Sequence, residues 1–561
     1  MNAEDGAAAR LIAERLRAAD DRELEALFAE RHVLAASGAW RDFFDAAEWL
    51  LLPEHVTDAL SVLPRDAVWR LASGEPLTTL ALTDEAGLAL RPVARALAGA
   101  NPTPTPDQEP PAATGAAAEH AAERAFTTIT ALADILLRAL GAPLARVGTG
   151  ALSATERRRL VDEQIVSAPG EADALVRLAG ATGLLRGHER VFGVTAAGAA
   201  WIEHSTPERW ATLAARLRDA LPDGLRRGEG WIDPALWSDA YPLDEAWPDK
   251  ARGWLEFARL VGVVADGDPP TEPAWAAPLR RGGAADTAAL AEFLPHEVDR
   301  VYLQNDLTAI SPGPLAPALD VRLRRMALRE SHAQASSYRF SEPTLTEALG
   351  AGETAASMRA FLEEISLTGV PQPLAYLLDR IADRHGLVRV SSDAERGHTV
   401  VTSTDPDLLR TLGVDQSLQS LGLVHEGERL RTAAAADTVF WALADARYPA
   451  VRVDAAGDPL PRDRRRVLPD RARPADAAAL IERLREGHAA DGDTAWLERE
   501  LEAAVKDRAT LAVEVNMPDG SVREMRLDAT GLGGGRLRGR DGGADVERTL
   551  PVSLIRSARR V

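Results

Sequence analysis

The chain has 561 residues, a net charge of −20 and no cysteine. Its length exceeds what one ordinary hydrophobic core accommodates, so we expect roughly three to five domains. The absence of cysteine excludes disulfides, thiolate zinc sites and cysteine nucleophiles. A chain this acidic is repelled by nucleic acid overall, although local basic patches can still bind it.

The start of the chain shows no basic segment followed by an apolar one, and no apolar run approaches the roughly eighteen residues of a membrane span. We therefore predict a cytoplasmic protein without membrane contact. Of the 65 basic residues, only Lys250 and Lys506 are lysines. A phosphate-binding Walker loop needs Gly-Lys-Ser/Thr, and neither lysine follows a glycine-rich turn. The sequence thus argues against a conventional P-loop ATPase.

Residues 1–100 are predicted to be helical only, because Leu11, Ile12 and Leu16, and then Leu24, Leu27 and Phe28, recur at helical spacing. We favour a packed helical domain over a protein-docking module. Residues 101–119 are rich in proline and small residues without periodicity, which predicts a semi-rigid linker.

The order of the elements predicted for residues 120–205 is that of a winged helix. A helix ends near Leu140, Ser153 begins a second one, a third runs over 171–182, and Val191 begins a strand of the wing. Arg157 and Arg158 are its candidate phosphate contacts. Because consecutive arginines point in different directions, we favour a winged helix used for protein packing.

Residues 206–293 contain half of the tryptophans, which predicts a Trp-rich helical region. Tryptophans can stack unpaired bases, but no basic residues alternate with these. We therefore favour packing anchors.

Residues 294–460 are predicted to form a small α+β domain. A helix should begin at Pro317, Ser341 should cap the next helix, and Met358, Phe361, Leu362 and Ile365 should form the buried stripe of a third. A further helix should end at Gly386, and the strands after residue 387 are expected to complete the same domain.

Three segments of this region, QNDLTAISPGPLAP (304–317), YRFSEPTLTEAL (338–349) and VPQPLAYLLDRIADRHGLVRV (370–390), resemble the N-terminal domain of XPB-type helicases. They resemble more closely the actinobacterial helicase-associated proteins that carry this domain without a motor. The resemblance implies an origin in DNA unwinding or repair machinery and supplies no reaction.

Two basic features of this region are candidates for nucleic-acid contact. Arg322, Arg325 and Arg329 recur at i, i+3 and i+7, which is either a solvated helix face or a stripe that follows phosphates. Residues 461–475 are predicted to be a basic linker that either contacts phosphates or solvates a hinge. Its arginines include Arg462, Arg464, Arg465 and Arg466.

Residues 476–561 should form two helices, near 480–485 and 496–505, and then a small SH3-like β-barrel. The arrangement is similar to WYL domains, but the Trp-Tyr-Leu signature is absent and the matching strand reads LAVEV. Arg536, Arg538 and Arg540 alternate on one strand face and are the last candidates for anion contact.

Catalytic and metal-binding motifs such as HExxH or GxSxG are absent from the sequence, so we predict no catalytic residue, cofactor or metal. The predicted class is a multidomain α+β protein with a helical N-terminal region, a winged-helix-like domain, a small α+β XPB-N-terminal-like domain and a C-terminal small β-barrel. We expect a non-catalytic DNA-binding or helicase-associated accessory protein of DNA repair or DNA processing that lacks the ATPase motor. The alternatives are a scaffold for a helicase or nuclease and a winged-helix/WYL-like transcriptional regulator.

Overall fold

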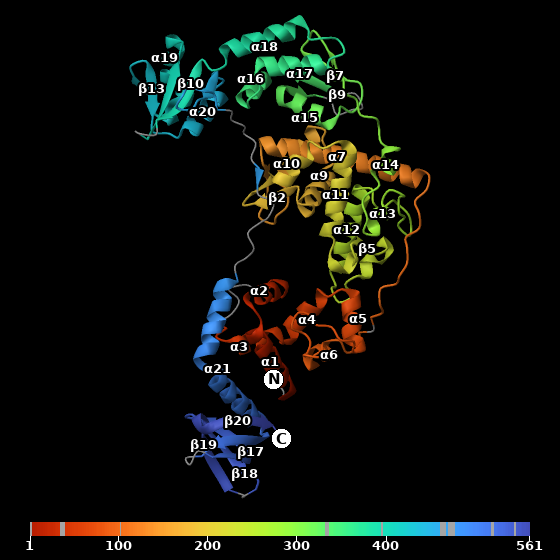
Figure 1. The fold of residues 1–561 in the computed structure, drawn as a ribbon, viewed down its shortest axis with the longest axis vertical. Helices are drawn as coiled ribbons and strands as arrows, with labels where there is room; N and C mark the ends of the chain where they lie inside the picture. The colour runs from red at the N-terminus through yellow and green to blue at the C-terminus, as the bar shows by residue number, and fades with distance from the viewer. Residues whose placement is uncertain are drawn as a thin grey trace.

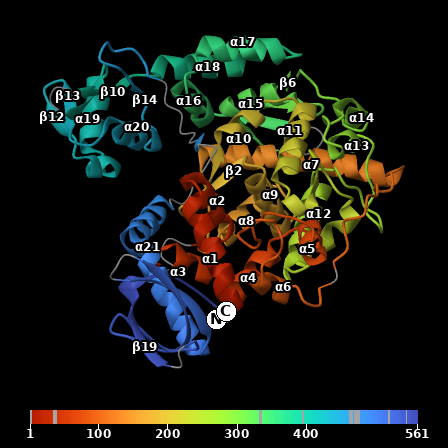
Figure 2. The ribbon, with the colours of Figure 1, turned by 60° about the horizontal axis from the view of Figure 1, so that its bottom comes forward.

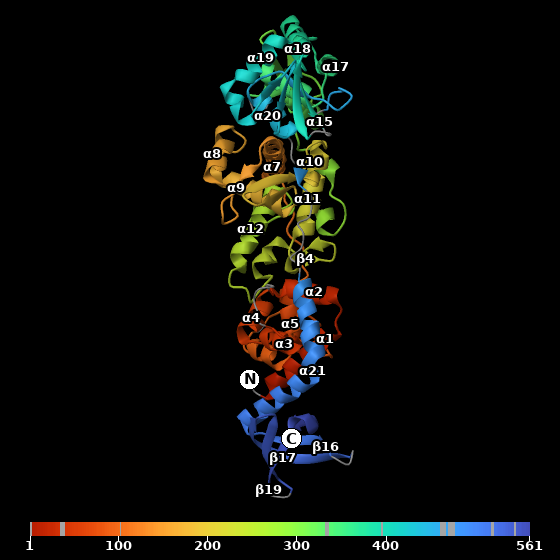
Figure 3. The same cartoon turned by 90° about the vertical axis from the view of Figure 1, so that its left-hand side faces the viewer.

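The structure is a computed structural model that describes residues 3–33, 40–100, 102–330, 336–393, 397–460, 467–468, 477–517, 521–543 and 546–560. It is a mixed α+β fold of several hydrophobic cores arranged along one long axis (Figures 1 and 3). The mixed α+β class is therefore confirmed.

The N-terminal module is helical, as predicted. Its helices are α1 (Ala3–Ala18), α2 (Asp21–Glu30), α3 (Phe43–Leu50), α4 (Pro53–Ser61), α5 (Arg65–Ser73) and α6 (Arg91–Ala96). Its core also contains Leu480, Ile481 and Leu484 from the distant helix α21 (Ala478–Asp507). We expected two helices in that last segment, and the structure has one continuous helix. Its glycines lower helix propensity by about 1 kcal/mol each, but no proline interrupts it.

Replacing Leu484 with alanine should lower the free energy of unfolding of the N-terminal module by about 2–5 kcal/mol, because a fully buried leucine leaves a cavity. Leu484 is 0% exposed in this core. Glu482→Ala, on the exposed side of the same helix, is the control and should have little effect. Denaturant unfolding followed by circular dichroism measures both. Equal effects would show that α21 does not belong to this core.

The central unit contains every helix and strand predicted for residues 120–205. Its elements are α7 (Ala116–Gly141), β1 (Leu144–Ala145), α8 (Ala154–Asp162), α9 (Pro169–Ala181), β2 (Leu185–His188), β3 (Val191–Thr195), α10 (Ala196–Trp201), α11 (Thr206–Ala220), β4 (Arg226–Arg227), β5 (Gly230–Trp231), α12 (Trp247–Leu260), α13 (Ala277–Arg280) and α14 (Thr287–Ala291). Strand β3 pairs with β1 and β2, and the late strand β15 (Val467–Leu468) joins it in parallel.

The tryptophans of the central unit are packing anchors, as predicted. Trp210, Trp231, Trp237, Trp247 and Trp275 are all buried. The core that contains them runs from Ala118 to Leu290 and also includes Val321. Residue 205 as a domain boundary stays a prediction, but the side chains on its two sides share this core.

The proline-rich segment lies along the central unit. Ala113 N–H donates to Glu272 O at 2.7 Å, and Glu272 N–H donates to Pro111 O at 2.7 Å. Gln108 Nε2 donates to Asp233 Oδ2 at 2.7 Å. Residues 106–113 are therefore bonded to the central unit, whereas Thr103 and Thr105 are bonded to Arg65 and Asp66 of α5.

Above the central unit lie two α+β cores (Figure 1). The first has the sheet order β6-β7-β9-β8, and its elements are β6 (Tyr302–Leu303), β7 (Thr308–Ser311), α15 (Pro317–Met326), β8 (Ala327–Arg329), β9 (Ser336–Phe340), α16 (Glu342–Gly350), α17 (Ala355–Ile365) and α18 (Gln372–Arg384). The predicted helix start at Pro317 and the cap at Ser341 are confirmed.

The strands after residue 387 form a second sheet and do not extend the first, contrary to expectation. The sheet order is β12-β13-β11-β10-β14, and the elements are β10 (Val388–Asp393), β11 (His398–Ser403), α19 (Pro406–Val414), β12 (Val424–Glu426), β13 (Arg429–Thr432), α20 (Ala436–Asp445) and β14 (Ala450–Arg452). Five strands with two helices bury their own core, so this sheet does not need the first one.

The C-terminal strands form an antiparallel sheet in the order β19-β18-β17-β16-β20. They are β16 (Thr510–Asn516), β17 (Val522–Gly533), β18 (Arg536–Asp541), β19 (Val546–Pro551) and β20 (Ile555–Arg560). Within the described residues β19 and β20 do not pair, so the expected closed barrel is an open sheet. Leu497, Leu501 and Ala504 of α21 cover its apolar face, and this cover takes the place of barrel closure. The chain ends lie near each other in two views (Figures 1 and 2).

Candidate nucleic-acid interface

Arg322 is a packing residue and not part of a phosphate-following stripe. Its Nε and Nη2 donate to the two carboxylate oxygens of Glu353 at 3.1 and 3.2 Å, and its guanidinium lies 4.5 Å from the ring centre of Phe361. The predicted i, i+3, i+7 face also breaks, because α15 ends at Met326 and places Arg329 on strand β8. The prediction of one continuous arginine face is therefore wrong.

The other arginines of this segment turn toward the central unit. Arg324 forms an ion pair with Asp134 of α7, and Arg329 Nη1 lies 3.3 Å from the same carboxylate. Arg325 Nη2 donates to Glu203 at 3.3 Å. The predicted site residues Arg325 and Arg329 thus bind carboxylates of this same chain.

A buried junction cluster, comprising Asp134, Asp320, Arg324, Arg329 and Tyr338, holds the two units together. Tyr338 donates to Asp320 Oδ1 at 2.6 Å. The pKa of Tyr338 is raised, mainly because the side chain is buried and also because the Asp320 carboxylate lies beside it. Burial would lower the pKa of Arg324, but the charges of Asp134 and Asp320 outweigh it and raise the pKa. Every charge in the cluster therefore faces an opposite one.

Sequence reasoning missed Asp134 and Arg324. The available signal was a single carboxylate within the apolar run Leu132 to Leu136, since a charge on a buried helix face needs a partner.

Arg209 is a further buried arginine beside this cluster. Burial lowers the pKa of Arg209 to about 10, and the Asp320 and Asp134 charges oppose this shift. The guanidinium of Arg209 lies 5.6 Å from the ring centre of Trp201.

The arginines of α8 behave differently from one another. Ser153 caps the helix by accepting from Glu156 N–H at 3.2 Å. Arg157 Nη1 donates to Asp173 at 2.8 Å, whereas Arg158 is exposed and forms no ion pair within the described chain. The basic linker residues Arg462, Arg464, Arg465 and Arg466 lie outside the described residues.

Strand β18 presents its arginines outward, as the alternation predicts. Arg536, Arg538 and Arg540 are exposed, while Leu537 and Gly539 are buried between them. Arg540 stands opposite Asp528 and Glu547, two acidic residues on the neighbouring strands.

Arg536 and Arg538 have no acidic residue opposite them. In register with Arg536 are Gly533 and Pro551, and in register with Arg538 are Gly531 and Thr549. We call these two arginines the β18 patch. Across the described chain neither forms an ion pair or side-chain hydrogen bond. Residues 508–560 contain ten arginines and seven acidic residues, in a chain whose net charge is −20. The C-terminal sheet is therefore locally basic.

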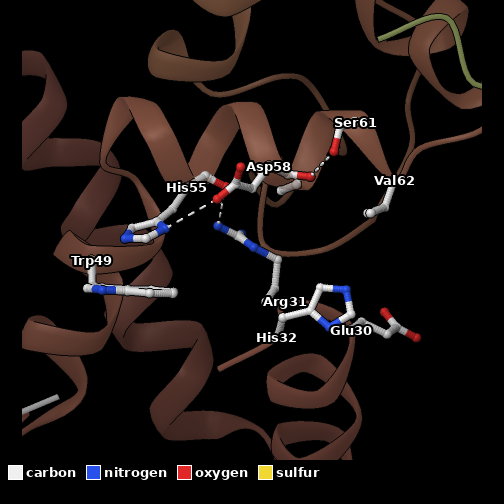
Figure 4. Close-up of a pocket in the computed structure, with 9 residues that line it drawn as sticks. Glu30, Arg31, His32, Trp49, His55, Asp58, Ser61 and Val62 are labelled. Atoms are coloured by element: carbon white, nitrogen blue, oxygen red, sulfur yellow. Dashed lines mark hydrogen bonds and ion pairs between the residues drawn. The ribbon is translucent and has the colours of Figure 1, made fainter. Parts of the chain in front are cut away.

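A cavity of about 390 Å³ lies in the N-terminal module, where Trp49 stacks on His55 with ring centres 3.5 Å apart (Figure 4). Arg31 points toward His55 and Asp58 of α4. Its guanidinium donates to the backbone oxygens of Leu80, Leu50 and His55 at 2.7, 2.6 and 3.1 Å. Burial lowers the pKa of Arg31 to about 10. Arg31 thus ties three segments together and is not a free anion ligand.

Within the described residues, no cluster of three or more His, Asp or Glu side chains is arranged to hold a metal ion. In that same part of the chain no helix combines the length and apolar character needed to cross a bilayer.

Residues 301–426 match a family described as the helicase conserved C-terminal domain. The match covers the first α+β core and continues to β12 of the second sheet. The helicase resemblance is therefore confirmed at the level of a helicase-related domain. No curated protein matches the chain.

Proposed function

We propose that this protein is a non-catalytic accessory of DNA processing or repair, which holds DNA or a DNA-bound helicase or nuclease in the cytoplasm. The helicase-related segment at residues 301–426 is the observation that carries this proposal. The two lysines of the sequence lie outside any Gly-Lys-Ser/Thr loop, which supports a role without nucleotide hydrolysis. The finer assignment of the segment to the XPB-type N-terminal domain belongs to the same proposal.

The order of elements in the central unit supports a winged-helix assignment. Helix α7, strand β1, helices α8 and α9 and the hairpin β2–β3 follow one another as that motif requires. Arg158 is an exposed arginine of α8 and remains a candidate contact. We also propose that the C-terminal sheet is related to WYL domains. The order of its strands and the packing of helix α21 on its apolar face are the basis of this proposal.

Direct DNA contact is proposed for the β18 patch. Arginine side chains that contact phosphate release counterions, and each contact steepens the salt dependence of log K by about 0.9. Arg536→Ala with Arg538→Ala should therefore weaken binding about tenfold at low salt and flatten the salt slope by about two.

Fluorescence anisotropy with labelled single-stranded, duplex and forked DNA measures this effect. The control is Arg41→Ala with Arg252→Ala, which removes the same charge from side chains that are 85% and 76% exposed. No binding by the unaltered protein to any of the three DNAs would rule out direct contact. An equal loss in the control would assign the effect to net charge.

The second candidate is a scaffold that binds a helicase or nuclease and touches DNA only through it. The use of Arg322, Arg325 and Arg329 in contacts within the chain favours this reading, since carboxylates of the chain already bind these guanidinium groups. A pull-down with nuclease treatment separates the two, because a scaffold keeps its partner after the DNA is removed.

A further inference from the structure

Arg324 and Arg325 lie at the end of α15 and Arg329 lies on β8, and we call these three arginines the α15 face. Two carboxylates of the central unit cover it: Asp134 of α7 meets Arg324 and Arg329, and Glu203 after α10 meets Arg325. Arginine recognises carboxylate and phosphate oxygens with the same fork of N–H donors. The carboxylates thus occupy positions that phosphate oxygens could take.

The cover is uneven across the face. At one end Asp134 is buried, with a side chain 5% exposed, and at the other end Glu203 is 59% exposed. Arg325 makes one hydrogen bond of 3.3 Å to Glu203, and its buried Nε has no acceptor. Val321 adds an apolar contact by inserting into the core of the central unit. The Glu203 end is therefore the weaker part of the contact.

We propose that the α15 face is a second binding site for the phosphate backbone of DNA, masked in this structure by Asp134 and Glu203. When the two units separate, DNA phosphates replace the two carboxylates on Arg324, Arg325 and Arg329. Arg322 stays on Glu353 and Asp320 stays beside Arg324, so three arginines face one remaining carboxylate of their own unit. The inference rests on the proposed DNA-related function and assigns the helicase-related domain a contact of its own.

The test removes the masking charges and keeps the side-chain shapes. Asp134→Asn with Glu203→Gln should tighten binding of a short labelled duplex about tenfold in anisotropy at low salt. The salt slope should steepen by about two to three, one for each unmasked arginine. Adding Arg324→Gln, Arg325→Gln and Arg329→Gln should return the affinity to that of the unaltered protein. A double variant without tighter binding, or tighter binding that survives the loss of all three arginines, would overturn the proposal.

A matched control makes the same change in net charge elsewhere on the central unit. Glu163→Gln with Asp266→Asn breaks the ion pairs with Arg138 and Arg124, at 3.0 and 2.8 Å, and should leave DNA affinity within about twofold. If the buried Asp134 variant does not fold, Glu203→Gln alone remains testable because that side chain is largely exposed. It should tighten binding about threefold, and an unchanged affinity would count against the proposal.

Separation of the units can be measured directly, because the chain has no cysteine to compete with introduced labels. A donor and an acceptor on Asp162→Cys in α8 and Tyr376→Cys in α18 report the distance between the two units, since both native side chains are exposed. Duplex DNA should lower the energy transfer in the Asp134→Asn, Glu203→Gln protein. Unchanged transfer at saturating DNA would contradict the unmasking.

The outcomes also separate this inference from the β18 contact. A gain that depends on Arg324 and Arg329, in a protein whose binding is unaffected by Arg536→Ala and Arg538→Ala, would support the α15 face and reject the β18 patch. Binding that depends on the β18 patch, with no gain in the double variant, would reject the α15 face and keep the proposed function.

Discussion

Trp210→Ala should lower the free energy of unfolding of the central unit by about 3–5 kcal/mol, among the largest effects expected for a single substitution in this chain. The indole is 0% exposed, and its Nε1–H donates to Val261 O at 2.9 Å. Removing the ring leaves a cavity, and the buried carbonyl loses its donor.

Denaturant unfolding followed by tryptophan fluorescence and circular dichroism measures this cost. Trp254→Ala is the matched control, because Trp254 packs against the same core but is only partly buried, and its cost should be less than half as large. Since α7 to α10 and α11 to α14 share one core, their unfolding should shift together. Two separate transitions with only one shifted would contradict a shared core.

Glu272→Ala should cost about 3 kcal/mol of stability, because it leaves Arg280 buried without its close partner. The Glu272 and Arg280 side chains are 9% and 8% exposed, with Arg280 Nε 2.7 Å from the carboxylate. Burial raises the pKa of Glu272, and the hydrogen bond and charge of Arg280 oppose that shift.

Thermal and denaturant unfolding test this cost against Glu109→Ala as control. Glu109 lies 3.3 Å from Arg280 but is 64% exposed, so its loss should cost much less than the loss of Glu272. Equal costs for the two variants would mean that the buried pair adds nothing beyond a surface contact. Because the backbone of Glu272 also binds residues 111 and 113, hydrogen exchange at Ala113 should rise in the variant.

Local signals in the sequence predicted most of the individual elements. Pro317 and Ser341 mark helix starts through proline geometry and capping, and Met358 to Ile365 form a buried stripe, all of which depend on near neighbours. Alternation along β18 predicted the exposed arginines for the same reason.

Long-range pairing accounts for what the sequence did not predict. Arg324 meets Asp134, a residue 190 positions earlier, and no local pattern distinguishes a solvated arginine from one that meets a distant carboxylate. The open C-terminal sheet depends on α21 covering its apolar face, which strand patterns alone do not reveal. For the same reason the second α+β sheet was expected to extend the first.

The position of helix α21 late in the sequence determines when the N-terminal helices can complete their core during synthesis. Leu480, Ile481 and Leu484 fill the core of helices whose residues are synthesised first. During translation those helices therefore lack part of their packing until nearly the whole polypeptide has left the ribosome, which leaves apolar surface open to chaperones in the interval. In nascent chains stalled before residue 480 is synthesised, protease should cleave within residues 3–100. In released chains that contain α21, the same residues should resist cleavage.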